Sequence, residues 1–295
     1  MSLQEFYNYE TKTLTLPLDF DEELIDIPKG TENIIFEDDA EAMISSDFEK
    51  SLDNLPDTVI NLFIGGKFNN SIDNLPKSLT KLTFSTISHF DKSVDNLPDK
   101  LTHLSLGTFF NKSVDNLPLS LTYLSFGCFF NQSVDNLPEN LSYLNLGLYF
   151  NREINNLPKN LTHLVLSHYF NKSVDNLPKN LTHLTFGYYY NQKITQLPQN
   201  LFYLKINSYL QNNDIIPKSV KELSLSCINN LINNLPYHIE KLFIDFYFED
   251  KDNKYITNIP LNIKEIVIEN ERFYKFLKNI PCETVITNLN IQYIE

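Results

Sequence analysis

Apolar residues recur along this chain at a fixed spacing. The pattern Leu-x-x-Leu-x-Leu/Phe returns every 20 residues, opening at Leu101, Leu121, Leu141, Leu161 and Leu181. Around the middle leucine, apolar and polar residues alternate, which is the period of a β-strand with one buried face. Later in the first of these units, Phe110, Val114 and Leu117 supply further apolar anchors, and the other units repeat them. The pattern predicts one short strand per unit.

A Leu-Pro pair closes each unit with the same period, at Pro98, Pro118, Pro138, Pro158, Pro178 and Pro198. Proline fixes φ and lacks an amide donor, so it suits an extended segment and not a helix interior. A strand, two corners and a proline leave no room for a helix in 20 residues. We therefore expect a mainly β repeat solenoid with coils of about 20 residues, one parallel sheet and an extended, mostly non-helical opposite side.

The repeats extend over nearly the whole chain, so we expect a single continuous domain. Residues 1–36 would be acidic N-terminal capping coils, and residues 37–268 the repeat array, with insertions near 37–45 and 245–254. The first insertion has room for one helical turn, and residues 269–295 would form a C-terminal capping coil with a short helix. Strand centres are expected at Leu14, Ile34, Leu62, Leu82, Leu104, Leu124, Leu144, Leu164, Leu184, Leu204, Leu223, Leu242, Ile266 and Leu289.

The strand segment resembles the leucine-rich repeat, with one consistent departure. Where that repeat has Asn, this chain has an aromatic residue, such as Phe109 or Tyr149, and its Asn follows two residues later, as at Asn111 and Asn151. The cadence Phe-Asn-x-x-Val/Ile…Leu-Pro resembles the FNIP repeat, a leucine-rich-like family of social amoebae and giant amoebal viruses. The resemblance implies protein interaction and no chemistry. Some members carry an F-box, and no such segment is visible before the repeats.

Charge and cysteine content narrow the class of partner and the compartment. The formal net charge is −13 and no run of basic residues occurs, which argues against nucleic acid and anionic membrane surfaces as partners. No signal peptide or apolar stretch of membrane-spanning length is visible. Cys128, Cys227 and Cys282 are widely spaced, which favours reduced thiols. We expect an intracellular protein, in the cytoplasm (that of the host cell if the protein is viral), and not a secreted one.

The strand residues that point away from the core are the candidate binding surface. Equivalent residues on neighbouring parallel strands lie about 4.8 Å apart. A stripe of His and Tyr is typical of protein-binding surfaces, although stacked aromatic residues also stabilise a sheet by themselves. The first row is His103, Tyr123, Tyr143, His163, His183 and Tyr203, and the second is Ser105, Ser125, Asn145, Val165, Thr185 and Lys205.

Other recurring residues are interpreted as structural. In each corner pair, such as Phe109 and Phe110, both are assigned to core and corner packing with the second pointing inward, and Asn111 is expected to bond the turn backbone. The Asp row, at Asp53, Asp73, Asp95, Asp115, Asp135 and Asp175, is interpreted as a solvated convex face. His163 and His183 would be neighbours, but zinc needs three or four ligands. We therefore expect no metal and no cofactor.

The chain lacks the motifs of common enzymes, such as a glycine-rich phosphate loop or His-Glu-x-x-His, so no enzymatic activity is expected. The main hypothesis is a non-enzymatic protein–protein interaction scaffold that binds a protein partner, including one from a host cell, through its open sheet face. The alternative is a structural or self-assembling component of an oligomer or virion. A narrower version of the scaffold is a substrate adaptor for a ubiquitin ligase acting in trans. Binding through the His residues would weaken on mild acidification.

Overall fold

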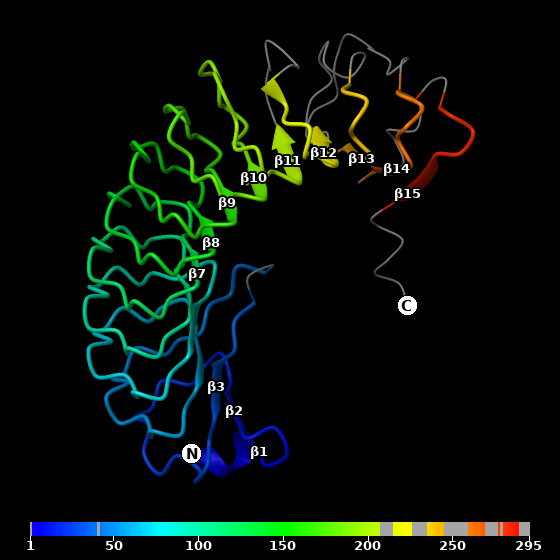
Figure 1. Cartoon of the computed structure of the whole chain (residues 1–295). Coiled ribbons are helices and arrows are strands. Elements are labelled where there is room, and N and C mark those ends of the chain that lie inside the picture. The colour runs from blue at the N-terminus through cyan, green and yellow to red at the C-terminus, as the bar shows by residue number, and fades with distance from the viewer. Residues whose placement is uncertain are drawn as a thin grey trace. The chain divides into compact units, whose positions relative to one another are not determined.

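The computed structural model describes residues 2–39, 42–206, 215–225, 235–244, 259–268, 277 and 280–288. The chain divides into two compact units, Met1–Leu161 (unit 1) and Thr162–Glu295 (unit 2). Both are stacks of short coils, each contributing one strand to a parallel sheet (Figure 1). The second predicted insertion and most of the predicted C-terminal helix lie outside the described residues.

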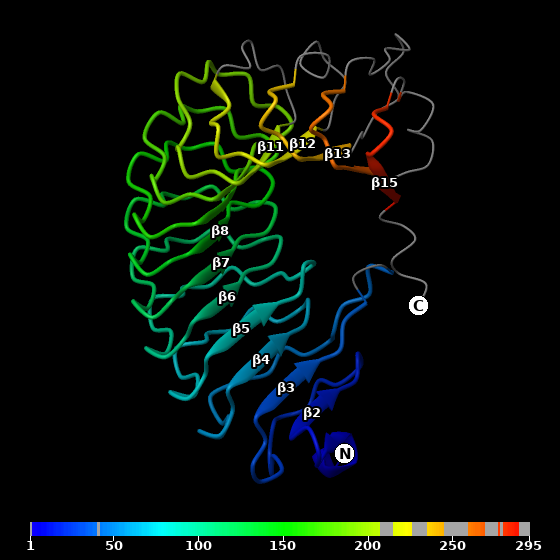
Figure 2. The same ribbon diagram turned by 45° about the vertical axis from the view of Figure 1, so that its right-hand side comes forward.

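Unit 1 begins with a short 3-10 helix and an antiparallel strand pair, which precede the parallel sheet. The antiparallel pair joins Tyr7 to Leu14 and covers the edge of the first parallel strand. The parallel strands then follow one another in chain order and lie side by side (Figure 2). The elements are η1 (Leu3–Phe6), β1 (Tyr7–Asn8), β2 (Thr13–Leu16), β3 (Asn33–Phe36), β4 (Asn61–Ile64), β5 (Lys81–Phe84), β6 (His103–Ser105), β7 (Tyr123–Ser125) and β8 (Tyr143–Asn145).

Unit 2 continues the same arrangement of parallel strands in chain order. Its strands are β9 (His163–Val165), β10 (His183–Thr185), β11 (Tyr203–Ile206), β12 (Glu222–Leu225), β13 (Lys241–Ile244), β14 (Glu265–Ile268) and β15 (Val285–Asn288). In the described part of the chain, helical structure consists of η1 and a 3-10 residue at Ile215, and no helix there is long and apolar enough to cross a membrane. The fold is the parallel-sheet solenoid that the 20-residue repeat predicts.

Strand positions agree with the sequence pattern up to the last coil. The predicted centres from Leu14 to Ile266 are each the second residue of a strand. The last prediction is wrong, because Ile266 pairs with Ile286 and not with Leu289, which lies outside the described residues. The distance from the proline explains this difference. Leu104 follows Pro98 by six residues and Ile286 follows Pro281 by five, whereas Leu289 follows it by eight.

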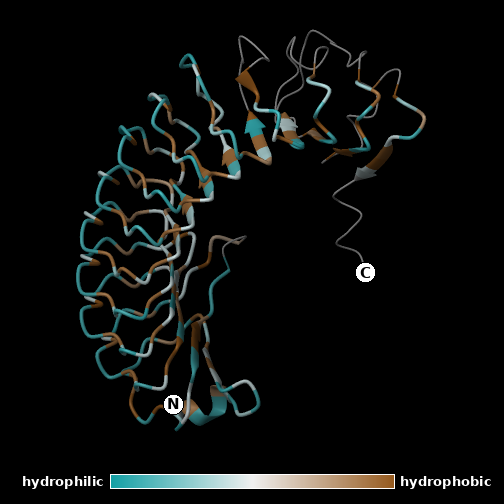
Figure 3. Ribbon diagram, viewed as in Figure 1, coloured by the Kyte–Doolittle hydropathy of each residue, from teal (hydrophilic) through white to brown (hydrophobic). Residues whose placement is uncertain are grey.

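The core forms from the apolar positions of the repeat. Leu104 and Phe110 are fully buried, and Val114 is 1% exposed. The buried phenylalanines stack from coil to coil along unit 1, with ring centroids of Phe110 and Phe130 6.1 Å apart. Hydrophilic residues gather instead on the loops of this unit that lie away from the strands (Figure 3). Burial of one large apolar side chain contributes roughly 1.5–3 kcal/mol, so each coil depends on its neighbours to cover these groups.

The corner asparagines bond the backbone, as the sequence predicts. The Asn131 backbone N–H donates to Asn111 Oδ1 at 2.9 Å, and the Asn151 N–H donates to Asn131 Oδ1 at 3.0 Å. In unit 2 the Asn191 N–H donates to Asn171 Oδ1 at 3.0 Å. Each Asn therefore links one coil to the next and satisfies a backbone donor at a corner where no strand ladder can do so.

The first insertion folds back on unit 1, and its described residues, 37–39 and 42–45, form an antiparallel bridge and no helical turn. Asp39 and Ile44 exchange two backbone hydrogen bonds of 2.8 Å, which makes an antiparallel bridge. The Asp38 carboxylate accepts from the Ser46 N–H at 2.8 Å and from the Ser85 hydroxyl, so it ties the insertion to a later coil. A Cβ on Gly65 would lie 2.2 Å from Ser46 Cβ. The glycine thus allows the insertion to pack directly on the backbone.

Candidate functional site

In unit 1 the first outward row is a stack of three aromatic rings. His103 and Tyr123 are 5.5 Å apart between ring centroids and 19° from parallel, and Tyr123 and Tyr143 are 4.4 Å apart and 9° from parallel. Parallel pairing of β6, β7 and β8 sets this spacing. Burial, followed by the neighbouring Tyr123, raises the pKa of the Tyr143 phenol. The sequence prediction that these side chains share the outward face is confirmed in this unit.

In unit 2 the corresponding row contains two histidines and one tyrosine. The His163 and His183 rings stack with centroids 4.1 Å apart, and His183 and Tyr203 are 5.8 Å apart. Burial lowers the pKa of both imidazoles, and the charge of His163 lowers that of His183 further. The outward Phe202, which precedes β11, also approaches His183 at 6.2 Å. Both histidines are therefore neutral at pH 7.

Threonines in the coil fix which ring nitrogen carries the proton. His183 Nδ1 lies 2.9 Å from Thr182 Oγ1, and that hydroxyl donates its one proton to the Thr162 carbonyl oxygen at 3.1 Å. The imidazole must then donate from Nδ1–H, which leaves Nε2 as an acceptor. His103 repeats this arrangement through Thr102 and the Thr80 carbonyl. The first row thus presents a hydrogen-bond acceptor at His103 in unit 1 and at His183 in unit 2.

The side chains of the second row are half-buried, and all but one of them are uncharged. It consists of Ser105, Ser125, Asn145, Val165, Thr185 and Lys205. Asn145 turns toward its own chain, because its Oδ1 accepts the Gly147 N–H at 3.0 Å. This carbonyl therefore serves the turn after β8.

The corner aromatics differ from the expectation that all of them are packed. The second residue of each pair points inward as predicted, with Phe110 and Phe130 fully buried. The first residues are exposed instead: Phe109 by 44%, Phe129 by 45% and Tyr149 by 42%. They stack on one another at 5.4 and 5.5 Å. Consecutive residues at the corner point in opposite directions, so the first of each pair forms a second outward aromatic ladder.

The Asp row is exposed, as expected, and it also forms a hydrogen-bond ladder. Asp115 accepts from the Asn136 amide at 3.0 Å and from the Ser113 hydroxyl at 2.8 Å. These two hydrogen bonds, the amide first, lower the pKa of the Asp115 carboxyl. The Ser-x-Asp-Asn sequence of the repeat therefore has a structural role. Among the described residues, no three His, Cys, Asp or Glu side chains gather where they could hold a metal ion.

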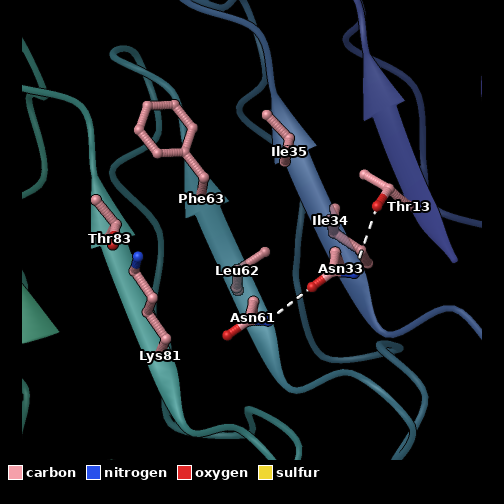
Figure 4. Close-up of a pocket in the computed structure, with 9 residues that line it drawn as sticks. All are labelled: Thr13, Asn33, Ile34, Ile35, Asn61, Leu62, Phe63, Lys81 and Thr83. Carbon is pink, nitrogen blue, oxygen red and sulfur yellow. Dashed lines mark hydrogen bonds between the residues drawn. The ribbon is translucent and has the colours of Figure 1, made fainter. Parts of the chain in front are cut away.

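One feature of the outward face escaped the sequence analysis, a hollow of about 340 Å³ over β2 to β5. Ile35 and Phe63 lie at one end of their strands, and Asn33 and Asn61 lie at the other (Figure 4). No repeating residue type marks it, because the outward residues of these coils change from strand to strand. It is lined by Thr13, Asn33, Ile34, Ile35, Asn61, Leu62, Phe63, Lys81 and Thr83.

Comparisons with known proteins agree with this geometry. The FNIP repeat model matches residues 90–129, 130–169 and 170–209. No curated protein matches the sequence. Among solved structures, an internalin from Listeria monocytogenes aligns with a TM-score of 0.50 and 14% identity over 98% of this chain and 89% of that one. YopM from Yersinia enterocolitica aligns with a TM-score of 0.37 and 17% identity over 92% of this chain and 72% of its own. The likeness to the internalin shows a leucine-rich-repeat-like fold and nothing about function.

Proposed function

Because residues 90–209 are FNIP repeats within a leucine-rich-repeat-like solenoid, we propose that the chain is a non-enzymatic scaffold that binds a protein. The binding surface would be the outward sheet face, with His103, Tyr123 and Tyr143 in unit 1 and His163, His183 and Tyr203 in unit 2. The widely spaced cysteines favour a reducing, intracellular setting for this interaction.

The observation that carries the proposal is the half-exposed position of these aromatic rings outside the core. The core is complete without them, since the inward leucines and phenylalanines are buried at every coil of the described repeat. Large, rigid aromatic side chains lose little conformational entropy on binding and dominate protein interfaces. The fixed Nε2 acceptors of His103 and His183 add directional contacts to this apolar surface.

The test is a crosslinking capture from cell lysate that compares three forms of the protein. The first is the native chain, and the second has threonine at the six His and Tyr positions of the first row. The third has serine at Phe109, Phe129, Tyr149, Tyr169 and Tyr189, the exposed corner aromatics. Threonine suits outward strand positions, as at Thr83, so the sheet should persist.

A partner that binds the native chain and the corner variant, but not the face variant, would support the proposal. Direct binding of that purified partner to the native chain should then be measured, and its affinity should fall at least about tenfold in the face variant. If every specific partner still binds the face variant, the proposed surface is wrong. Circular dichroism and thermal unfolding verify that both variants remain folded.

The exposed corner aromatics favour self-assembly as a second candidate function. Three of them stack along unit 1 and expose two-fifths or more of their surface. Contiguous exposed apolar groups of this kind commonly mark association surfaces. Sedimentation velocity over a range of protein concentrations tests the idea. Self-assembly predicts concentration-dependent oligomers that disappear in the corner variant, and a strict monomer at high concentration would contradict it.

A further inference from the structure

The hollow over β2 to β5 has an apolar end and a polar end. Ile35 and Phe63 occupy the third position of β3 and β4, where strand side chains point away from the core, and Ile35 is 38% exposed. Asn33, Asn61 and Lys81 occupy the first position of their strands at the other end of the hollow (Figure 4). A surface with an apolar pocket beside a few oriented polar groups is the common form of a binding site.

The asparagine side chains at the polar end are held in one orientation. Asn61 Nδ2 donates to Asn33 Oδ1 at 2.7 Å, and Asn33 Nδ2 donates to the Thr11 carbonyl at 3.0 Å and to Thr13 Oγ1 at 3.3 Å. All of these bonds run toward β2. Since the amide nitrogen of Asn61 faces β3, its Oδ1 points toward β5, whereas the Lys81 side chain extends along β5 and places its nitrogen near Thr83 (Figure 4). The hollow therefore presents a fixed acceptor at its polar end and an ammonium group farther along β5, near Thr83.

The charge of the hollow is opposite to that of the protein. The formal net charge is −13, yet no carboxylate lines the hollow. In the described strands β2 to β8, no outward side chain is Asp or Glu. Glu32, which precedes β3, is paired with Lys12 at 2.5 Å, and Glu37, which follows β3, does not line the hollow. Lys81 is thus a local positive charge on a carboxylate-free part of an acidic molecule.

We propose that this hollow binds an extended segment of a protein partner that carries a large apolar side chain two residues away from a carboxylate, since residues i and i+2 of an extended chain share a face. The apolar side chain would lie against Ile35 and Phe63, and the carboxylate would accept a charge-assisted hydrogen bond from Lys81 Nζ. Asn61 Oδ1 would accept a backbone N–H of the same segment. The inference builds on the proposed function, because the outward sheet face is again the binding surface, but it uses none of the His and Tyr residues of the first row.

Four capped and amidated hexapeptides test the chemistry without a known partner. They are Gly-X-Ser-Z-Ser-Gly, in which X and Z share one face of an extended chain and the pair X-Z is Leu-Glu, Leu-Gln, Ser-Glu or Leu-Lys. Affinity for the purified full chain is measured by ligand-observed NMR titration. The Leu-Glu peptide should bind most tightly, and the Leu-Gln and Ser-Glu peptides should each bind about three- to tenfold more weakly. The preference for Leu-Glu over Leu-Gln should shrink as salt is added.

Variants of the chain assign the binding to the hollow. Lys81→Glu should weaken Leu-Glu binding about tenfold and make Leu-Lys the preferred peptide. Lys77→Glu is the matched control, because Lys77 is an exposed lysine of the preceding turn outside the hollow, and it should leave the order of affinities unchanged. Phe63→Thr, which copies Thr83 of the next strand, should remove the preference for Leu-Glu over Ser-Glu. Thermal unfolding verifies the fold of each variant.

The proposal is overturned if no peptide binds saturably up to millimolar concentration, if Leu-Glu and Leu-Gln bind equally, or if Lys77→Glu has the same effect as Lys81→Glu. Its failure is distinguishable from failure of the proposed function. The six-residue face variant contains an intact hollow and should bind the Leu-Glu peptide as the native chain does. If the face variant still binds the Leu-Glu peptide and also still captures every protein partner, the hollow remains a binding site. The His and Tyr residues of the first row are then not part of the binding surface.

Discussion

At the residue scale, Gly127 shows how closely the coils of unit 1 approach one another. A Cβ at this position would lie 2.2 Å from the Gly107 carbonyl oxygen, a distance that real Cβ contacts do not reach. The obstructing atom belongs to the backbone, so a rotamer change cannot relieve the clash. The glycine therefore serves close packing between successive coils.

We predict that Gly127→Ala destabilises the protein, because the backbones of two coils must move apart. The expected loss is about 1–3 kcal/mol in the free energy of unfolding, as for other overpacked sites. Urea unfolding monitored by circular dichroism measures it. Leu119→Ala is the control, since Leu119 is 77% exposed and its truncation should change the unfolding free energy by less than about 0.5 kcal/mol. If Gly127→Ala is as stable as the native chain, the close approach of the Gly127 and Gly107 backbones is wrong.

A second prediction at this scale concerns the stacked histidines. Burial lowers the pKa of His163 and His183 in the folded chain. The unfolded chain, with a His pKa of about 6.5, then binds more protons below that pH, so acidification favours unfolding. The contribution of the neutral His163 and His183 to the free energy of unfolding is complete above about pH 6.5, and it is lost as the pH falls through the lower pKa values of the folded chain. Urea midpoints at pH 7.5 and 5.5 measure the loss.

The double variant His163→Tyr, His183→Tyr provides the comparison, because it copies the stacked pair Tyr123 and Tyr143. Its urea midpoint should depend less on pH between 7.5 and 5.5 than that of the native chain. An unchanged pH dependence in the double variant would assign the acid sensitivity to other groups.

At the scale of one element, the coil edge opposite the strand is held by side chains. Pro118 cannot donate a backbone hydrogen bond, and the segment before it has no strand partner, so the Asn136 amide joins the coils by donating to Asp115. Ser113 donates to the same carboxylate from within its own coil. The same contacts recur between Asp95 and Asn116 at 3.1 Å. The Asp and Asn side chains thus hold neighbouring coils together at this edge, and the buried leucines hold them together at the sheet.

We predict that Asn136→Ala lowers stability at neutral pH by about 0.5–1 kcal/mol, through loss of one exposed hydrogen bond to a carboxylate. The pKa of Asp115 is lowered by this contact, so its stabilisation is present above about pH 3.9 and is lost as the pH falls through the folded pKa. Urea unfolding should therefore show a smaller deficit at pH 2.5 than at pH 7.

Asn140→Ala is the matched control for this measurement. The Asn140 amide donates to the Leu119 carbonyl oxygen at 2.9 Å, with no titratable partner. Its loss should cost a similar amount at both pH values. If both variants show the same pH dependence, the carboxylate is not the source of the effect at Asn136.

At the scale of the whole molecule, each coil depends on its immediate neighbours. Phe110 stacks on Phe90 and Phe130, each at 6.1 Å, and the backbone contacts likewise join adjacent coils. The stability of such an array is approximately a sum over coils and the interfaces between them. The effect of a local cavity should therefore decay along unit 1.

We predict that Phe110→Ala lowers the free energy of unfolding by about 3–5 kcal/mol, because Phe110 is fully buried. Hydrogen exchange followed by mass spectrometry should show the largest loss of protection near residues 90–130 and smaller losses farther away in unit 1. Phe109→Ala, at the exposed neighbour, is the control and should change little. A uniform loss of protection through unit 1 would indicate all-or-none unfolding instead.

The sequence by itself determined the coil and most of its register. The inward Leu104 and Phe110, the strand in each coil, the corner Asn111 and the sharing of an outward face by Tyr123 and Tyr143 all follow from local alternation repeated every 20 residues. A repeat makes such predictions strong, because each coil meets a neighbour of the same pattern and one register satisfies them all. Ile286 follows Ile266 by the regular 20 residues, so the prediction of Leu289 was wrong by three residues because it departed from the period.

Only the tertiary structure decided what depends on differences between coils. Asn33, Phe63 and Lys81 come from strands without a shared residue type, so their hollow exists only after these strands pair. The exposure of Phe109 and the proton position on His183 likewise depend on the path of the corner and on a hydroxyl whose proton goes to the preceding coil. The physical reason is that periodicity specifies what every coil has in common, whereas a binding site is made by contacts that differ from one coil to the next.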